Sequence, residues 1–365
     1  MGSRKFSITI TSGILVSALG INGVALGSTC SDGCSQPPPP PDNTKKDAAI
    51  KNGQPSSNQG LANFSSAGGG AGFMDALGGA VGGFSGGGSG SLTGNFKRFA
   101  LGRRGETGAA AAPGGQNWNA WAAVSHSNIG YSFAPLSSSG QVNVYLGGVD
   151  YTFDNNLVFG VAVAADYTNI DEHFNAGKVT GNGTTVSPYV GYPLTNKLVV
   201  DGSIGYGKTD FDTAVAGVTG SYRTDRYMGT LGISYRETKG AWQFTGRGAF
   251  LTVHNKLGAY TLSNSTAVQE ATVNLSQVRA YGQAAYDAGM FTPYVGVSFI
   301  YDVHHPDQLP VLGVASSNDR SGWTPAVGVR FRTKGTVYGA IQYSSEQSRS
   351  EVKNNQLLFN VGLRF

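Results

Sequence analysis

The feature that most constrains this chain is a two-residue alternation of apolar and polar positions, repeated in many segments after residue 116. Alternation with this period is typical of β-strands with two chemically different faces. It is clearest in residues 157–172, 321–332 and 355–365. Twelve strands are predicted, at residues 117–131, 140–153, 157–172, 180–193, 198–212, 221–237, 241–260, 270–288, 291–303, 321–332, 336–345 and 355–365.

The length of these segments separates a membrane barrel from a soluble sandwich. Strands of soluble domains are usually about 5–6 residues long, whereas a tilted strand needs about 9–11 residues to cross a bilayer. Most of the predicted segments have at least the bilayer-crossing length. Because backbone groups in lipid must be paired internally, spanning strands must close into a barrel. The sequence therefore predicts an all-β fold, a twelve-stranded antiparallel transmembrane β-barrel over residues 117–365.

Composition supports a barrel and argues against other classes. Charged residues make up only 13% of the chain, against about 25% in soluble domains. After residue 30 there is no run of about 20 apolar residues, which a membrane-spanning helix would need. Basic residues are scattered singly along the predicted strands, so no nucleic-acid partner is expected.

The predicted connections alternate between short and long. The short ones are residues 154–156, 194–197, 238–240, 289–290 and 333–335, and the long ones lie near 132–139, 173–179, 213–220, 261–269, 304–320 and 346–354. Outer-membrane barrels have short periplasmic turns and longer outer loops. With twelve strands, this rhythm predicts that both ends of the barrel lie in the periplasm.

The polar faces of the strands are expected to line the lumen. The lumen charges predicted from the alternation are Arg226, Arg236, Arg247, Arg279, Arg330, Asp166, Asp201 and Asp225. Two interpretations remain open, a charged lumen that holds a translocating or plugging segment, or a salt-bridge network that fills a small barrel. The segment 140–153 is less regular, since Val144 and Leu146 share a face with Asp150, and a β-bulge that resets the phase is expected there.

The region before the barrel divides into three parts. Residues 1–27 are predicted to be a signal peptide, with Arg4 and Lys5 before an apolar stretch and small residues at its end. Residues 28–91 are rich in proline and glycine and are predicted to be a disordered extension. Residues 92–116 are predicted to form a short helix and linker, with the helix over residues 92–106.

Cys30 and Cys34 are the only cysteines. In an exported chain they could form a small local disulfide. Lipid attachment at Cys30 is disfavoured because no leucine lies three residues before it.

Three patterns that could carry chemistry are rejected for lack of context. Residues 202–209 match GxxxxGK[ST], but this phosphate-binding loop requires a following helix, and no helical pattern follows. His304 and His305, near Asp302 and Asp307, lack metal-ligand spacing. His126 lies between Ser125 and Ser127 without an identified acid. The expectation is a protein without enzymatic activity, cofactor or metal.

Residues 95–365 resemble the translocator domain of autotransporters, the proteins of type V secretion. The resemblance rests on Asn-Trp-Asn-Ala-Trp at 117–121, Gly-Gly-Val-Asp-Tyr at 147–151 and Leu-Phe-Asn-Val-Gly-Leu-Arg-Phe at 358–365. In that family a helix before the first strand threads the pore and connects to an exported passenger. Here the preceding region is short for a passenger and shows no repeat.

The resemblance implies a monomeric barrel in the lipid of the outer membrane, exported by the general secretory route. It implies periplasmic chaperones and the barrel-assembly machinery as partners. The machinery would read an assembly signal at Phe359, Val361, Leu363 and Phe365. The expected function is to anchor or translocate a short N-terminal segment to the cell surface. The alternative is a stand-alone porin-like channel with a periplasmic tail.

Overall fold

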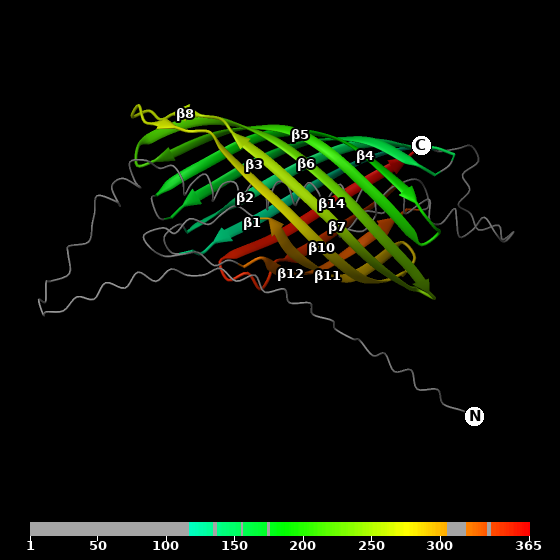
Figure 1. Ribbon diagram of the computed structural model, residues 1–365. Coiled ribbons are helices and arrows are strands. Elements are labelled where there is room, and N and C mark those ends of the chain that lie inside the picture. The colour runs from blue at the N-terminus through cyan, green and yellow to red at the C-terminus, as the bar shows by residue number, and fades with distance from the viewer. Residues whose placement is uncertain (1–116, 134–136, 155, 174–175, 305–318, 334–336) are drawn as a thin grey trace, which may run out of the picture. The chain divides into compact units, whose positions relative to one another are not determined.

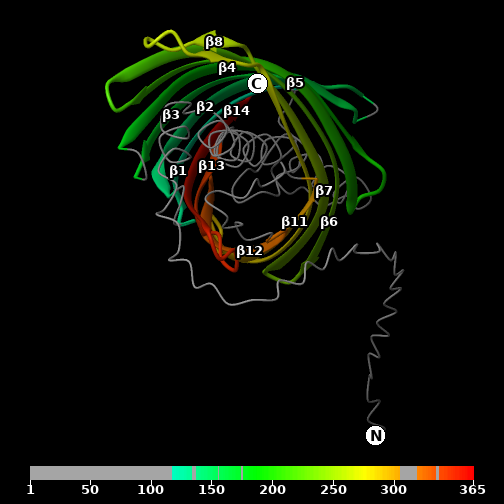
Figure 2. The same cartoon turned by 60° about the vertical axis from the view of Figure 1, so that its left-hand side comes forward.

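Twelve strands form a closed antiparallel barrel, so the predicted fold class is confirmed (Figures 1 and 2). The computed structural model describes residues 117–133, 137–154, 156–173, 176–304, 319–333 and 337–365. The barrel strands are β1 (Trp118–Tyr131), β2 (Ser138–Thr152), β3 (Val158–Glu172), β4 (Gly177–Pro193), β5 (Leu198–Val215), β6 (Val218–Lys239), β7 (Trp242–Leu257), β10 (Ala271–Tyr286), β11 (Phe291–His304), β12 (Ser321–Arg332), β13 (Val337–Ser345) and β14 (Val352–Arg364).

The predictions made for residues 1–116 concern the signal peptide, the extension, the helix and the cysteine pair. All of them fall outside the described residues. In the part of the chain that the structure describes, no helix is long and apolar enough to cross a membrane.

The first and last strands close the barrel. β1 pairs with β14 from Asn119 opposite Arg364 to Tyr131 opposite Val352. The backbones of Trp118 and Phe365 exchange two hydrogen bonds of 3.2 and 3.1 Å. The barrel therefore begins and finishes at the same end, which also carries the short turns and is called the turn end below. The opposite end is the loop end.

One of the predicted long connections, residues 213–220, is wrong, because the strands continue through it. β5 and β6 extend to Val215 and Val218 and pair with each other up to these residues. The connection between them is only Ala216 and Gly217, both with positive φ (49° and 83°). This is the backbone that a two-residue hairpin turn requires, and glycine adopts it at little cost. The expected loop 173–179 is also shorter than predicted, because β3 ends at Glu172 and β4 already begins at Gly177.

The connection from β7 to β10 packs against the extended part of β6. It contains the short strands β8 (Tyr260–Thr261) and β9 (Ala267–Val268), which pair with each other. The Ser263 amide donates a hydrogen bond to the Thr219 carbonyl at 2.7 Å. Tyr222 stacks between Phe211 and Tyr260, with ring centroids 5.2 and 4.9 Å away. This small aromatic cluster holds the loop-end extension together.

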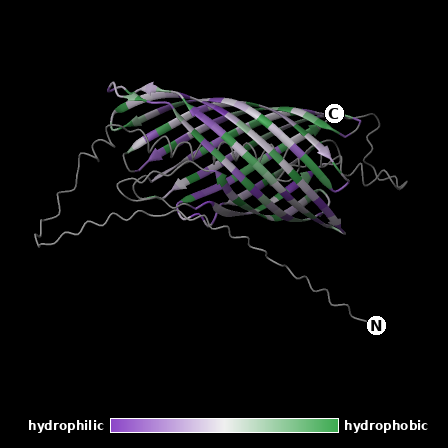
Figure 3. Cartoon of the chain, in the orientation of Figure 1, coloured by the Kyte–Doolittle hydropathy of each residue, from purple (hydrophilic) through white to green (hydrophobic). Residues whose placement is uncertain are grey.

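Hydrophobic and hydrophilic residues alternate along the strands of the barrel (Figure 3), and the exposed side chains of the outer face are largely aliphatic or aromatic. Leu231 and Ile204 are 65% and 70% exposed and project outward. Aromatic pairs lie toward both ends: Tyr145–Tyr167 and Tyr206–Tyr227 toward the loop end, Trp118–Tyr151 and Trp242–Tyr286 toward the turn end. An apolar band bordered by aromatic girdles is the surface expected of a barrel in lipid.

The bulge expected near Asp150 is absent. β2 pairs without interruption with β1 and with β3, so its phase never changes. Val144, Leu146 and Asp150 all face inward and are at most 4% exposed. The irregular alternation in this segment therefore reflects an inner face that is partly apolar.

Candidate functional site

The lumen is the candidate functional site, since it collects most of the buried polar side chains in the described part of the barrel. Most of the predicted lumen charges do lie on inner faces. The inward residues are Asp166 on β3, Asp201 on β5, Arg226 and Arg236 on β6, Arg247 on β7, Arg279 on β10 and Arg330 on β12.

Asp225 is the exception and was wrongly placed in the lumen. It adjoins Arg226 in a regular strand, so the two side chains must project to opposite faces. Arg226 is buried inside, whereas Asp225 lies outside and accepts a hydrogen bond from the Tyr206 hydroxyl at 3.0 Å.

Two ion pairs cross the inner wall between strands that are not neighbours. Arg226 on β6 reaches Asp166 on β3 at 3.2 Å, and both side chains are at most 4% exposed. Arg247 on β7 binds both carboxylate oxygens of Asp201 on β5, at 2.5 and 2.7 Å. Ser234, on the strand between them, accepts a third hydrogen bond from Arg247 at 2.9 Å. These contacts brace the wall formed by β3 to β7.

A second network lies near the turn end and was not anticipated from the sequence. The hydroxyl of Tyr189 donates to Asp150 at 2.8 Å and accepts from the Trp121 indole at 2.8 Å. Asn119 also donates to Asp150, at 2.9 Å, and accepts from the Tyr338 hydroxyl at 2.7 Å. The network thus joins β1, β2, β4 and β13.

Several residues of this network belong to two of the sequence stretches on which the family resemblance rests. Residues 117–121 supply Asn119 and Trp121, and residues 147–151 supply Gly148 and Asp150. A Cβ added at Gly148 would come within 3.0 Å of the Trp121 indole. The glycine therefore leaves room for the indole ring that binds Tyr189, and the two stretches act together.

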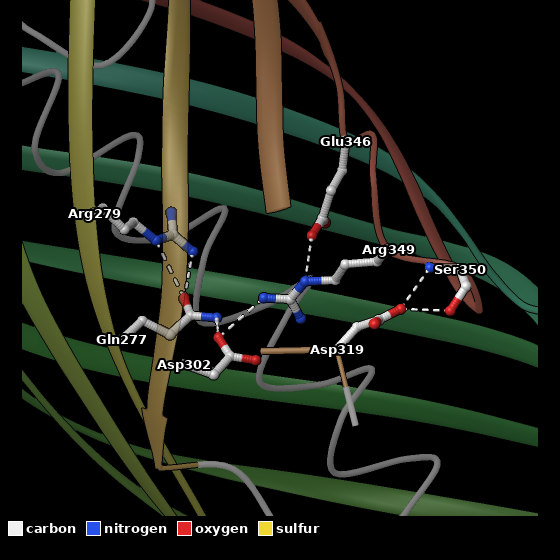
Figure 4. Close-up of polar contacts among 7 residues, drawn as sticks. All are labelled: Gln277, Arg279, Asp302, Asp319, Glu346, Arg349 and Ser350. Carbon is white, nitrogen blue, oxygen red and sulfur yellow. Dashed lines mark hydrogen bonds and ion pairs between the residues drawn. The ribbon is translucent and has the colours of Figure 1, made fainter. Parts of the chain in front are cut away.

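A third cluster sits at the loop end (Figure 4). Arg349, in the β13–β14 connection, binds Asp302 of β11 and Glu346 of its own loop, each at 3.0 Å. Gln277 donates to Asp302 at 2.7 Å and accepts from Arg279 at 2.8 Å. Burial raises the pKa of the Glu346 carboxyl, and the neighbouring Arg349 and Arg279 oppose this shift. The cluster ties the loop to the inner wall.

Replacing Arg349 with glutamine is expected to release this loop. The change removes both ion pairs and leaves the buried carboxyl groups of Asp302 and Glu346 without the cation that they share. Cleavage by a glutamate-specific protease after Glu346 or Glu351 should accelerate by about tenfold. Mass spectrometry of the fragments measures this rate. Arg223→Gln is the control, because its pair with Asp210 is exposed; equal acceleration in both variants would contradict the anchoring role.

Part of the loop-end half of the lumen wall is apolar, beside the polar cluster just described, and the prediction of a charged lumen missed this part. The inward residues concerned are all at most 4% exposed: Val142, Val144, Leu146, Ile170, Val179, Leu251, Val253, Leu257 and Val273. An apolar surface is poorly suited to water, so this part of the wall favours contact with apolar groups.

Where the structure describes the three rejected motifs, it gives further reasons against each of them. Residues 202–209 belong to β5, and Lys208 and Thr209 project to opposite faces, so they cannot cradle one phosphate together. His126 is on the outer face and bonds Asn143 at 2.7 Å, whereas Ser125 and Ser127 face inward. Asp302 is held by Gln277 and Arg349, while His305 and Asp307 lie outside the described residues. Whether the chain has enzymatic activity stays a prediction.

A known protein family and several solved barrel structures are similar to this chain. The family model described as Autotransporter beta-domain matches residues 120–344, more than half of the chain. The translocator domain of the autotransporter NalP from Neisseria meningitidis is similar with a TM-score of 0.58 and 11% identity, covering 75% of this chain and 95% of that one. The β-domain of the Bordetella autotransporter BrkA has a TM-score of 0.56 and 15% identity, covering 68% and 100%.

One curated sequence relative, the protein YaiT of Escherichia coli K12, is 24% identical over 225 residues. The match covers 58% of this chain but only 23% of YaiT. The shared part is therefore a small share of that longer protein.

Proposed function

This chain belongs to the autotransporter β-domain family and is an outer-membrane barrel, and on that premise we propose that the barrel anchors residues 28–91 and brings them to the cell surface. One observation carries the proposal: β1 begins at the turn end, beside the final residue Phe365. In outer-membrane barrels the short turns face the periplasm. Residues before 117 therefore join the barrel on the periplasmic side, and the outer face is covered by lipid. The lumen is the route left for them to the surface.

The wall of the lumen suits a polypeptide occupant. Its loop-end half combines an apolar part with the cluster around Arg349, and its turn-end half carries hydrogen-bonding side chains. The proposed occupant is the segment 92–106, which carries apolar Phe96, Phe99 and Leu101 beside basic residues. Such a segment could place its apolar side chains against the apolar wall. An apolar surface of this kind is unfavourable in a water-filled porin.

Conductance in planar lipid bilayers tests this proposal against a porin-like channel. The full chain should conduct little, and the variant lacking residues 92–106 should conduct strongly. Deletion of residues 50–64, in the proposed displayed segment, is a length-matched control and should leave the pore closed. A full chain that conducts as strongly as the 92–106 deletion would show an open channel and contradict the proposed occupant.

The steps that deliver the barrel are also proposals. Residues 1–27 would direct the chain into the general secretory route, and periplasmic chaperones would carry it to the barrel-assembly machinery. Phe359, Leu363 and Phe365 support the proposed assembly signal, because they lie on the outer face and are 43–57% exposed. The closed ring needs no second copy, so a monomer is proposed, without enzymatic activity.

Lipid contact makes a quantitative prediction on β6. Leu231 lies midway between Tyr227 and Tyr235 on the outer face. Leu231→Arg should lower the free energy of unfolding by about 2–4 kcal/mol, because the charge would sit near the bilayer midplane. Urea unfolding of the barrel in lipid vesicles measures this. Thr219→Arg, on the same face beyond Tyr227, should cost about 0–1 kcal/mol. Equal costs at both positions would contradict the assigned membrane position.

A further inference from the structure

Buried hydrogen-bond donors gather in the turn-end half of the lumen, outside the networks described above. Arg330 on β12 is 7% exposed, Gln283 on β10 is 6% exposed and Thr245 on β7 is 5% exposed. Among the described residues, two guanidinium nitrogens of Arg330, the amide nitrogen of Gln283 and the hydroxyl of Thr245 find no hydrogen-bond partner. Buried polar groups are nearly always paired, so a cluster of unpaired ones calls for an explanation.

Two of these side chains are neighbours on the wall. Thr245 lies directly opposite Gln283 on the neighbouring strand and opposite Arg236 on the other side. The Tyr281 hydroxyl donates to the Gln283 side-chain oxygen at 2.7 Å, which leaves the amide nitrogen free to donate elsewhere. The Arg330 guanidinium lies 5.0 Å from the ring centre of Tyr294. The aromatic ring holds this cation in place without neutralising it.

No described carboxylate balances the positive charge of Arg330. Asp201 is already bound by Arg247, and Arg330 forms no ion pair with any described residue. N–H donors on an uncompensated cation are the chemistry that binds an anion.

We propose that Arg330 binds an anionic group, a carboxylate or a small inorganic anion such as phosphate, at the periplasmic end of the lumen, with Gln283 and Thr245 as further unpaired donors in the same half of the lumen. The guanidinium and amide N–H groups would donate to its oxygens. The site does not depend on whether residues 28–91 reach the cell surface. It would make this end of the lumen selective for negatively charged groups.

Thiol modification inside the full chain tests the site. Thr292 faces the lumen directly opposite Arg330, so Thr292→Cys in a Cys30→Ser, Cys34→Ser background places a reporter beside it. The anionic 2-sulfonatoethyl methanethiosulfonate should react about tenfold faster than the cationic trimethylammonium reagent, after correction for their rates with a free thiol. Arg330→Gln should lower this ratio by about fivefold. Arg223→Gln, which removes the same charge from the outer face, should leave it unchanged.

Two further experiments are needed. One tests the site without a substitution that could prevent folding, and the other identifies the source of the anion. Inorganic phosphate, at matched ionic strength, should slow the anionic reagent in the parent chain, which tests the site without changing Arg330. Glu106 is the only acidic residue between Asp75 and Asp150. If its carboxylate occupies the site, Glu106→Gln should speed the anionic reagent, whereas no effect together with phosphate competition would indicate a free anion. A corrected ratio near one, a ratio insensitive to Arg330→Gln, or no reaction with either reagent would overturn the proposal.

Discussion

Replacing Arg226 with methionine should lower the free energy of unfolding of the barrel by about 3–5 kcal/mol. The reason is Asp166, which is 3% exposed and would keep a buried negative charge without its cation. The loss is larger than the worth of the pair itself, because the unpaired carboxylate pays its full desolvation cost. Urea unfolding in lipid vesicles, followed by tryptophan fluorescence, measures the change.

The double variant Arg226→Met with Asp166→Leu separates this explanation from simple loss of packing. It removes both charges and fills the space with apolar groups, so most of the lost stability should return. The exposed pair is a second control, since Arg223→Gln should cost at most about 1 kcal/mol. A double variant as unstable as Arg226→Met alone would show that the buried charge is not the cause.

Gly160→Leu should destabilise the barrel by at least about 3 kcal/mol. A Cβ at Gly160 would come within 3.0 Å of the Tyr189 ring and of Asp150. The new side chain would therefore push Tyr189 away from the position in which its hydroxyl binds both Asp150 and Trp121. Overpacking and the loss of two buried hydrogen bonds add to each other. The measurement is the same urea unfolding experiment.

Gly282→Leu provides the matched control for Gly160. Both glycines lie inside strands, but a Cβ at Gly282 would meet nothing within 4 Å. The change should alter stability by at most about 0.5 kcal/mol. If the two substitutions cost the same, the loss at Gly160 would reflect strand glycines in general rather than the place that Gly160 leaves for Tyr189.

Much of the barrel could be predicted because a strand in lipid has only two faces. Period-two alternation located all twelve strands, and the segment 321–332 matches β12 at both ends. The rhythm of the connections predicted that the barrel begins and finishes at one end, which the pairing of Trp118 with Phe365 confirms. Alternation is a local property, so it can be read without knowing which strands are neighbours.

The interior was harder to predict, because it depends on contacts across several strands. Arg226 meets Asp166 three strands away, and alternation alone cannot say which cation meets which anion. The error at Asp225 had a simpler cause: adjacent residues in a strand cannot share a face, so only one of Asp225 and Arg226 could enter the lumen. The apolar inner wall was missed because an apolar side chain on the polar face of one strand resembles an irregularity.

The loop-end extension was missed for a related reason. Residues 213–220 are rich in small and polar residues and resemble a loop in the sequence. They form strand because β5 and β6 continue to pair beyond the apolar band, where both faces tolerate polar side chains. Pairing between strands, rather than burial of one apolar face, determines the structure there.

The central claim is that the barrel exposes its N-terminal segment on the cell surface. Trypsin added to intact cells tests it directly, since Lys45, Lys46 and Lys51 lie in the proposed displayed segment. An antibody against residues 52–64 and an antibody against the barrel then follow the two parts, with a soluble periplasmic protein as the control for an intact outer membrane. The prediction is cleavage within residues 45–51 on intact cells while the periplasmic protein stays whole. Cleavage only after the outer membrane is permeabilised would contradict the claim.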